Sequence, residues 1–182
     1  MEFLDVKTLL TIVHLLGVVT GAGGAYLSDA MFFSTVKDEK VSKTELRFLK
    51  IGSRFVWFGL TLLIISGIGI FLTDTETYLN SSKFLTKMTI VGVILLNGIV
   101  FHMSHLPRIE RHVGHHFPSS DEFMRHRPLL LASGALSFVS WTSAIILGSL
   151  KILPYSYSSI MIVYLSVIIV AIISTQILFR HR

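Results

Sequence analysis

The chain alternates between long apolar stretches and short polar ones, and this pattern predicts its architecture. A helix needs about 20 mostly apolar residues to cross a bilayer. Five stretches have this length: 8–33, 51–72, 84–104, 128–150 and 158–179. Apolar residues run on within them without the two-residue alternation of a membrane strand. The sequence therefore predicts an all-α membrane protein, a five-transmembrane-helix bundle that forms a single domain over residues 1–182.

The basic residues lie in alternate connections, and this asymmetry predicts an orientation. Lysine and arginine gather in residues 34–50, in residues 105–127 and at the C-terminus. The other side of the predicted bundle carries only Lys7, Lys83 and Lys151. Because basic loops stay in the cytoplasm, we expect the N-terminus outside and the C-terminus in the cytoplasm.

Composition agrees with a membrane protein and excludes several kinds of chemistry. The chain is 52% hydrophobic and 15% charged, which is typical of membrane proteins rather than soluble ones. It has no cysteine, which excludes disulfides, thiolate metal sites and cysteine nucleophiles. The net charge of +5 reflects the cytoplasmic loops, so nucleic acid is not expected as a partner. The expected partners are the lipid bilayer and either a second copy or a larger membrane complex.

Two local signals predict where helices begin. Ser42 and Glu45 have the S-x-x-E spacing of a capping box, so the second helix is expected to start near Lys43, ahead of its apolar stretch. Pro128 suits the first turn of a helix, and it stands at the start of the fourth apolar stretch.

The first apolar stretch carries a histidine and small residues on one helical face. The stripe starts at His14 and continues at intervals of three or four residues through Gly17, Gly21, Gly24 and Ser28. One interpretation is a close helix-packing seam with a neutral, hydrogen-bonded histidine. The other is a haem b site, in which His14 binds the iron and the glycines form a groove for the macrocycle.

Lys87 is predicted to share a layer with His14. Both lie within a few turns of the outer ends of their helices, given a rise of about 1.5 Å per residue. Lys87 either extends to water or binds an anionic group such as a haem propionate. His102 lies near the opposite, cytoplasmic ends of the helices, so one haem in a monomer does not reach both histidines.

Two opposite charges are predicted near the cytoplasmic end of the first two helices. Ionisable residues at membrane depth need a partner or a function. Asp29 and Arg54 lie on antiparallel sequence neighbours, so we expect a structural ion pair between them. Arg54 alternatively extends to the lipid headgroups.

The third connection is rich in histidine. His112 and His116 are four residues apart and would share a helical face, and with His115 they form a candidate site for a divalent metal. The alternative is a basic surface that attracts anionic lipid headgroups.

Three stretches carry a family resemblance: VHLLGVVTGAGGAYLSDAMFF, RFVWFGLTLLIISGIGIFL and SKFLTKMTIVGVILLNGIVFH. They resemble small bacterial inner-membrane proteins similar in plan to the HemJ-type protoporphyrinogen oxidases and the CopD-like membrane domains. His14 and Lys87 match the family's early histidine and the lysine that opens its third helix. Over residues 13–102 the resemblance implies haem b binding and electron transfer. The chain departs from the family pattern in two ways: a glycine-rich stretch stands where the family has tryptophans, and Asp29 lies within the membrane. For this reason the resemblance does not imply the oxidase activity.

Three functions are compatible with these features. The first is a haem b-binding redox protein, an oxidoreductase if it is an enzyme, with an unknown redox partner. The second is a metal or proton transporter that uses Asp29, Arg54 and His102 together with the histidines of the third connection. The third is a cofactor-free structural subunit of a membrane complex.

Overall fold

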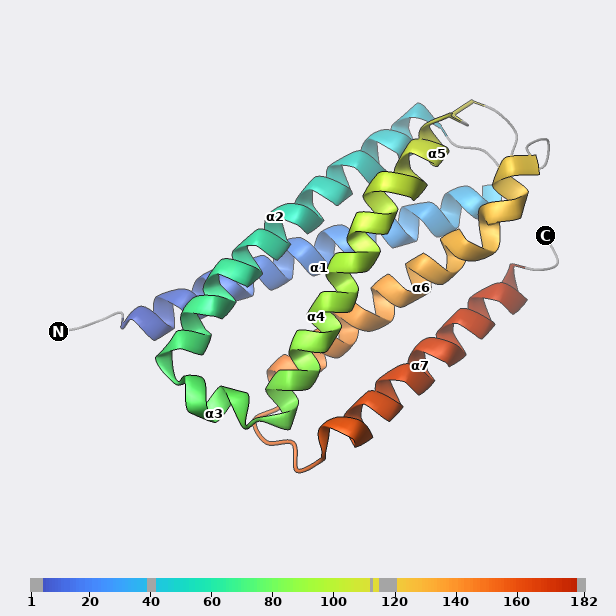
Figure 1. The fold of residues 1–182 in the computed structure, drawn as a ribbon. Coiled ribbons are helices and arrows are strands. Elements are labelled where there is room, and N and C mark those ends of the chain that lie inside the picture. The colour runs from blue at the N-terminus through green and yellow to red at the C-terminus, as the bar shows by residue number, and fades with distance from the viewer. Residues whose placement is uncertain (1–4, 39–41, 112, 115–120, 180–182) are drawn as a thin grey trace.

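The computed structural model describes residues 5–38, 42–111, 113–114 and 121–179, and this part of the chain is helical and has no strand (Figure 1). Five long helices run up and down the bundle: α1 (Val6–Asp38), α2 (Lys43–Thr73), α4 (Ser82–Val100), α6 (Asp121–Ser149) and α7 (Tyr157–Leu178). Three short ones are α3 (Thr75–Leu79), the π-helix η1 (Phe101–His105) and α5 (Leu106–Arg111). Because η1 and α5 extend α4, they make one continuous segment with it.

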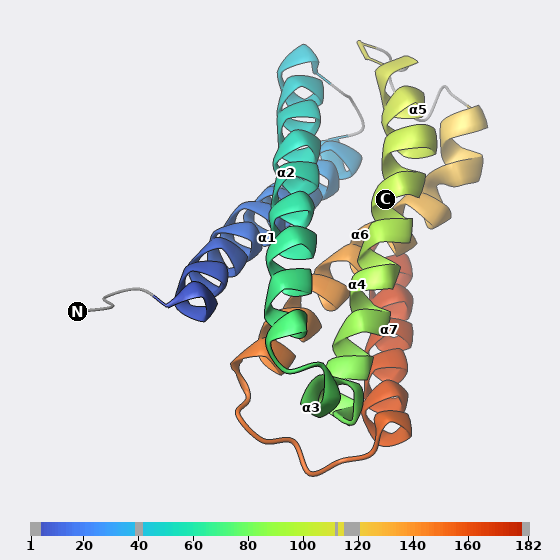
Figure 2. The ribbon, with the colours of Figure 1, turned by 60° about the vertical axis from the view of Figure 1, so that its left-hand side comes forward.

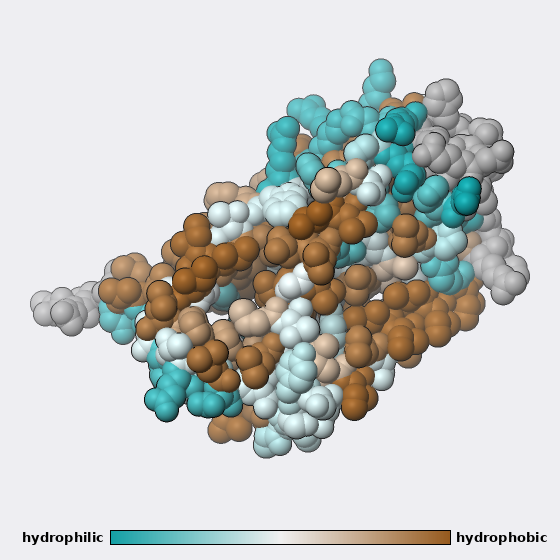
Figure 3. Space-filling view, viewed as in Figure 1, coloured by the Kyte–Doolittle hydropathy of each residue, from teal (hydrophilic) through white to brown (hydrophobic). Residues whose placement is uncertain are grey.

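Five helical segments are long and apolar enough to cross a membrane, which confirms this part of the prediction and indicates a multi-pass membrane protein. Large apolar side chains such as Leu16, Ile65 and Val170 are exposed on the outside of the bundle. Figure 3 shows this apolar surface along the middle, with hydrophilic residues at both ends. We call the end where α2 begins and α5 ends the basic end, and the other the opposite end.

The helices extend beyond the apolar stretches that predicted them. α2 begins at Lys43 with the expected capping box, in which Ser42 Oγ accepts from the Glu45 N–H at 3.1 Å and Glu45 Oε2 accepts from the Ser42 N–H at 2.7 Å. The predicted start of the fourth helix is wrong, because α6 begins at Asp121 and Pro128 lies inside it. Hydropathy marks the apolar part of a helix, whereas the helix itself continues through polar residues.

The closest helix pair is α1 with α2, which pack along facing small residues. Along this α1–α2 seam, His14 faces Ser66, Gly21 faces Gly59 and Ser28 faces Gly52. The positions step by seven residues in opposite directions along the two helices, which is the spacing of an antiparallel coiled coil. A Cβ atom on Gly59 would overlap the backbone of Gly21. The two backbones are therefore in direct contact.

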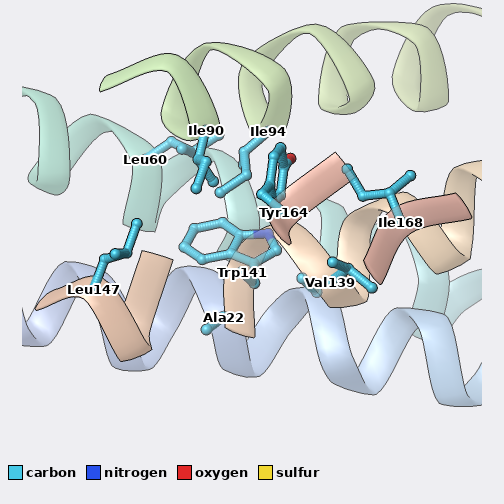
Figure 4. Packing of buried hydrophobic residues seen from close by; sticks show 10 residues of the cluster. Ala22, Leu60, Ile90, Ile94, Val139, Trp141, Leu147, Tyr164 and Ile168 are labelled. Atoms are coloured by element: carbon cyan, nitrogen blue, oxygen red, sulfur yellow. The ribbon is translucent and has the colours of Figure 1, made fainter. Parts of the chain in front are cut away.

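The remaining helices are arranged around α6. Figure 2 shows α1 and α2 on one side and α4 and α7 on the other, and α6 contacts α1, α4 and α7. Trp141 of α6 is buried in the centre, among apolar residues from every long helix (Figure 4). Tyr164 of α7 is tied to α6 by a hydrogen bond of 2.7 Å to Ser140. The core thus fixes the rotation of α6, on which the site depends.

The direct backbone contact at the seam predicts a large effect of one methyl group. We expect Gly59→Ala to destabilise the protein by about 1–3 kcal/mol, because the Cβ atom meets backbone that has no room to move. Gly23→Ala is the control, since a Cβ atom there meets nothing within 4 Å and alanine favours a helix by up to about 1 kcal/mol. Reversible unfolding in mixed detergent, followed by circular dichroism, measures both. Equal stability of the two variants would contradict the seam.

Candidate functional site

A cavity lies between α1, α2, α4 and α6 in the half of the bundle nearer the basic end. Its volume is about 50 Å³, which is room for a few water molecules at roughly 10–15 Å³ each. Its walls include apolar side chains such as Phe32 and Trp141, with Trp141 on the side of the opposite end. The polar side chains that line it are Ser28, Asp29, Ser53, Asn97, Ser133 and Ser137.

Asp29 is the one carboxyl group among the residues that line this cavity. Its side chain is partly buried and accepts a hydrogen bond from the hydroxyl of Ser137 on α6. Its second oxygen, Oδ2, has no hydrogen-bond partner among the described residues, and neither does the neighbouring Ser28 Oγ. Buried polar atoms without a protein partner are where ordered water or a ligand is expected.

The predicted ion pair between Asp29 and Arg54 is absent, which corrects the sequence interpretation. Arg54 is exposed on the outside of α2, and a different residue of α2, Lys50, forms an ion pair with Glu110 at 2.5 Å. The reason is helical rotation. Since Gly52 faces α1, a residue two positions later points about 200° away. Asp29, one residue after Ser28, turns away from α2 and towards α6.

Other polar residues of the cavity wall are paired across helices. Asn97 donates from Nδ2 to the Ser133 carbonyl at 3.1 Å, and its Oδ1 accepts from Ser133 Oγ at 2.8 Å. On the α2 side, Ser53 Oγ lies 3.3 Å from Nδ1 of His102. These pairs leave Asp29 and Ser28 as the wall groups with unsatisfied oxygens. The sequence analysis assigns neither Asn97 nor the serines of α6 to a site, although their depth along the helices matches that of Asp29.

His14 lies at the opposite end, and its tautomer follows from a chain of hydrogen bonds. Its Nδ1 is 3.0 Å from Ser66 Oγ, and Ser66 is fully buried. The Ser66 hydroxyl donates to the Leu62 carbonyl at 2.6 Å. Its single proton is thus in use, so Ser66 Oγ accepts a proton from His14 Nδ1–H. The other ring nitrogen, Nε2, therefore carries a lone pair that is available to a ligand.

Lys87 lies close enough to His14 for its charge to act on the ring. The Lys87 Nζ atom also lies near Gly148 of α6, within 3.8 Å of where a Cβ atom would stand. His102 is at the basic end, against Ser53 and Trp57. The structure therefore brings together His14 and Lys87 and keeps the two histidines apart.

The predicted haem-facing groove is filled by protein. A Cβ atom on Gly17 would lie 2.9 Å from Leu63, one on Gly24 would lie 2.9 Å from Phe55, and one on Gly21 would lie 2.5 Å from Trp141. The stripe is the α1–α2 seam and makes no open surface for a macrocycle. The packing interpretation of the glycines therefore holds, because α2 and α6 use the space that their missing side chains leave.

The candidate metal site of the third connection lies outside the described residues. His112, His115 and His116 all fall there. Within the described part of the chain, no group of three or more histidine, aspartate or glutamate side chains is placed to hold a metal ion.

Comparison of the chain with protein-family models, curated proteins and solved structures finds no match. The resemblance to the HemJ-type and CopD-like proteins therefore stays a prediction. What the protein does has to be inferred from the Asp29 cavity and from the His14 end.

The hydrogen-bond chain at His14 predicts one tautomer. We expect nitrogen NMR of selectively labelled protein to show the neutral His14 ring with its proton on Nδ1, because Ser66 Oγ accepts there. Ser66→Ala removes the acceptor, so the tautomer preference should be lost. His102→Gln is the control, since it leaves this end untouched and should not change the His14 signals. A proton on Nε2 in the wild type would contradict the assignment.

Proposed function

We propose that this protein is an integral membrane protein that binds a proton at Asp29 and transfers protons across the membrane. The single observation that carries the proposal is a carboxyl group whose buried Oδ2 atom has no partner among the described residues, lining a cavity between α1, α2, α4 and α6. The proposal keeps the transporter function predicted from the sequence and assigns it to Asp29. Arg54, which is exposed on the outside of α2, has no part in it.

The energetics of a buried carboxylate support a proton as the ligand. An ionised aspartate inside a membrane costs roughly 3 kcal/mol on insertion scales. Among the described residues, the structure supplies Asp29 with one hydroxyl donor, Ser137, and no charged side chain contributes to its environment. The carboxyl group therefore needs a proton, or a cation from outside the protein, to be stable in place. Because intramembrane carboxyl groups of this kind form proton relays, a proton is the ligand we assign.

The position of Trp141 supports access to the cavity from one end at a time. Trp141 is buried between the cavity and the opposite end of the bundle. The cavity is nearer the basic end, which the distribution of lysine and arginine assigns to the cytoplasm. In the proposed orientation the N-terminus lies outside a bacterial inner membrane, and Asp29 exchanges its proton with the cytoplasmic side. Transfer to the other side then requires α6 and Trp141 to shift.

Proton flux in liposomes tests the proposal. We expect purified protein to acidify or alkalinise the lumen when a potassium diffusion potential is applied, as reported by an enclosed pH-sensitive dye. Asp29→Asn should abolish this flux, because the amide keeps the size of the side chain but does not exchange a proton at this site. Asp74→Asn is the matched control: Asp74 accepts from the Thr77 N–H at 3.3 Å to cap α3 and is exposed.

Two outcomes would contradict this function. Flux that survives Asp29→Asn would remove Asp29 from the pathway. Flux that requires sodium, with radioactive sodium uptake lost in Asp29→Asn, would show that the cavity takes a metal cation instead.

A second candidate function, haem b binding with electron transfer, is favoured by one observation at the other end. His14 has Nδ1 fixed by Ser66 and a free lone pair on Nε2, which is how second-shell hydrogen bonds prepare a histidine to bind a metal. The charge of Lys87 acts on the His14 ring, so Lys87 is the cation that we assign to a haem propionate. A haem bound to His14 would have to lie on the Lys87 side of the ring, because α2 and α6 cover the glycines. Haem bound there would supply one-electron redox chemistry.

Absorption spectroscopy tests the second candidate. Protein purified from haem-replete cells should show a Soret band and, after reduction, separate α and β bands. We expect His14→Ala to lose these bands because the iron ligand is removed, whereas His102→Ala should retain them. A colourless wild-type preparation, or bands that persist in His14→Ala, would exclude haem at this position and leave the proton-transfer proposal unaffected.

A further inference from the structure

The Asp29 cavity has a polar contact that leads to the surface. Ser53 lines the cavity and is 6% exposed, and its Oγ atom lies 3.3 Å from Nδ1 of His102. His102, in contrast, is exposed at the basic end of the bundle. One hydrogen bond therefore separates the wall of the cavity from a titratable side chain on the outside of the protein.

The position of His102 depends on an irregular turn of helix. It is the second residue of η1, the π-helical turn between α4 and α5. Single π-helical turns inside longer helices are rare and occur frequently at functional sites. The indole of Trp57 packs at 81° to the His102 ring, with 6.5 Å between centroids. This contact and Ser53 together hold the imidazole with Nδ1 towards the cavity.

We propose that His102 and Ser53 carry protons between the cytoplasmic solvent and Asp29. The relay rests on the proposed function, in which Asp29 is the proton-binding group. A proton from solvent adds to His102 Nε2, and the proton on Nδ1 passes to Ser53 Oγ. The Ser53 hydroxyl proton then passes through cavity water to Asp29 Oδ2. Each intermediate group gains one proton and loses one, so no net charge remains on Ser53 or His102.

The cavity supplies what the last step needs. Asp29 Oδ2 and Ser28 Oγ have no hydrogen-bond partner among the described residues, and a water needs two or more polar partners to be held in place. The volume of about 50 Å³ holds several waters. Water bonded to these oxygens and to Ser53 completes a hydrogen-bonded path from the His102 ring to the carboxyl group.

Hydrogen–deuterium exchange at the Asp29 carboxyl group tests the relay. The C=O infrared band of the protonated acid, identified by its absence in Asp29→Asn, shifts when protein is moved into D₂O, and the rate of this shift is measured. We expect His102→Gln to slow it by at least about tenfold, since glutamine keeps the hydrogen bond to Ser53 but removes the proton acceptor. Added imidazole should restore the rate. His126→Gln, a histidine substitution elsewhere at the basic end, should exchange like the wild type.

The outcomes separate the relay from the function it serves. An intact Asp29 band that exchanges in His102→Gln at the wild-type rate overturns the relay and leaves Asp29 as the proton-binding group. Absence of a protonated Asp29 band from the wild type at every accessible pH overturns both. Ser53→Ala provides a second, smaller change. Slower exchange in Ser53→Ala, with the Asp29 C=O band at its wild-type frequency, supports the relay. Exchange at the wild-type rate in both Ser53→Ala and His102→Gln excludes it.

Discussion

The contact between the backbones of α1 and α2 sets the geometry of the whole bundle. Where Gly21 and Gly59 meet, no side chain separates the two helices, so neither helix is free to rotate or slide. Ser28 against Gly52 fixes the same register one seam position further towards the basic end. Because the two helices behave as one rigid unit, every other side chain on them has a determined direction.

The functional features follow from that constraint. With Ser28 turned into the seam, Asp29 is directed towards α6, where Ser137 meets it. With Gly52 turned into the seam, the next residue, Ser53, is directed to the cavity and to His102. On α2, Gly52 packs in the seam and its neighbour Ser53 lines the cavity, whereas on α1 Ser28 does both and its neighbour Asp29 lines the cavity. Close packing at the seam fixes the direction of the polar side chains beside it and leaves only a small cavity. Such a cavity suits a small ligand.

The fold was predictable from hydropathy, whereas the site was predictable only in part. Apolar length and the Ser42–Glu45 capping box gave the five long helices and the start of α2 correctly, since both are local properties of the sequence. The partner of Asp29 depends on tertiary packing, because it is set by which face of α2 packs against α1. Gly52 lies on that face, and the positions of the charged residues in the sequence do not indicate this. The pairing with Arg54 failed for that reason, and no local feature of the sequence marks Ser137 as the partner.

Asp29 is synthesised well before its partner Ser137, and this delay matters while the chain enters the membrane. α1 and α2 adjoin in sequence and pack closely, so they form a helical hairpin as soon as both have been made. In that hairpin Asp29 already points away from α2, yet its hydrogen-bond donor belongs to α6, which is made later. Until α6 arrives, the carboxyl group faces lipid or the insertion machinery without a partner. The uncharged acid is the form that avoids the cost of a charge in that setting, so early assembly would favour the same protonated state that the proposed function assigns to the finished cavity.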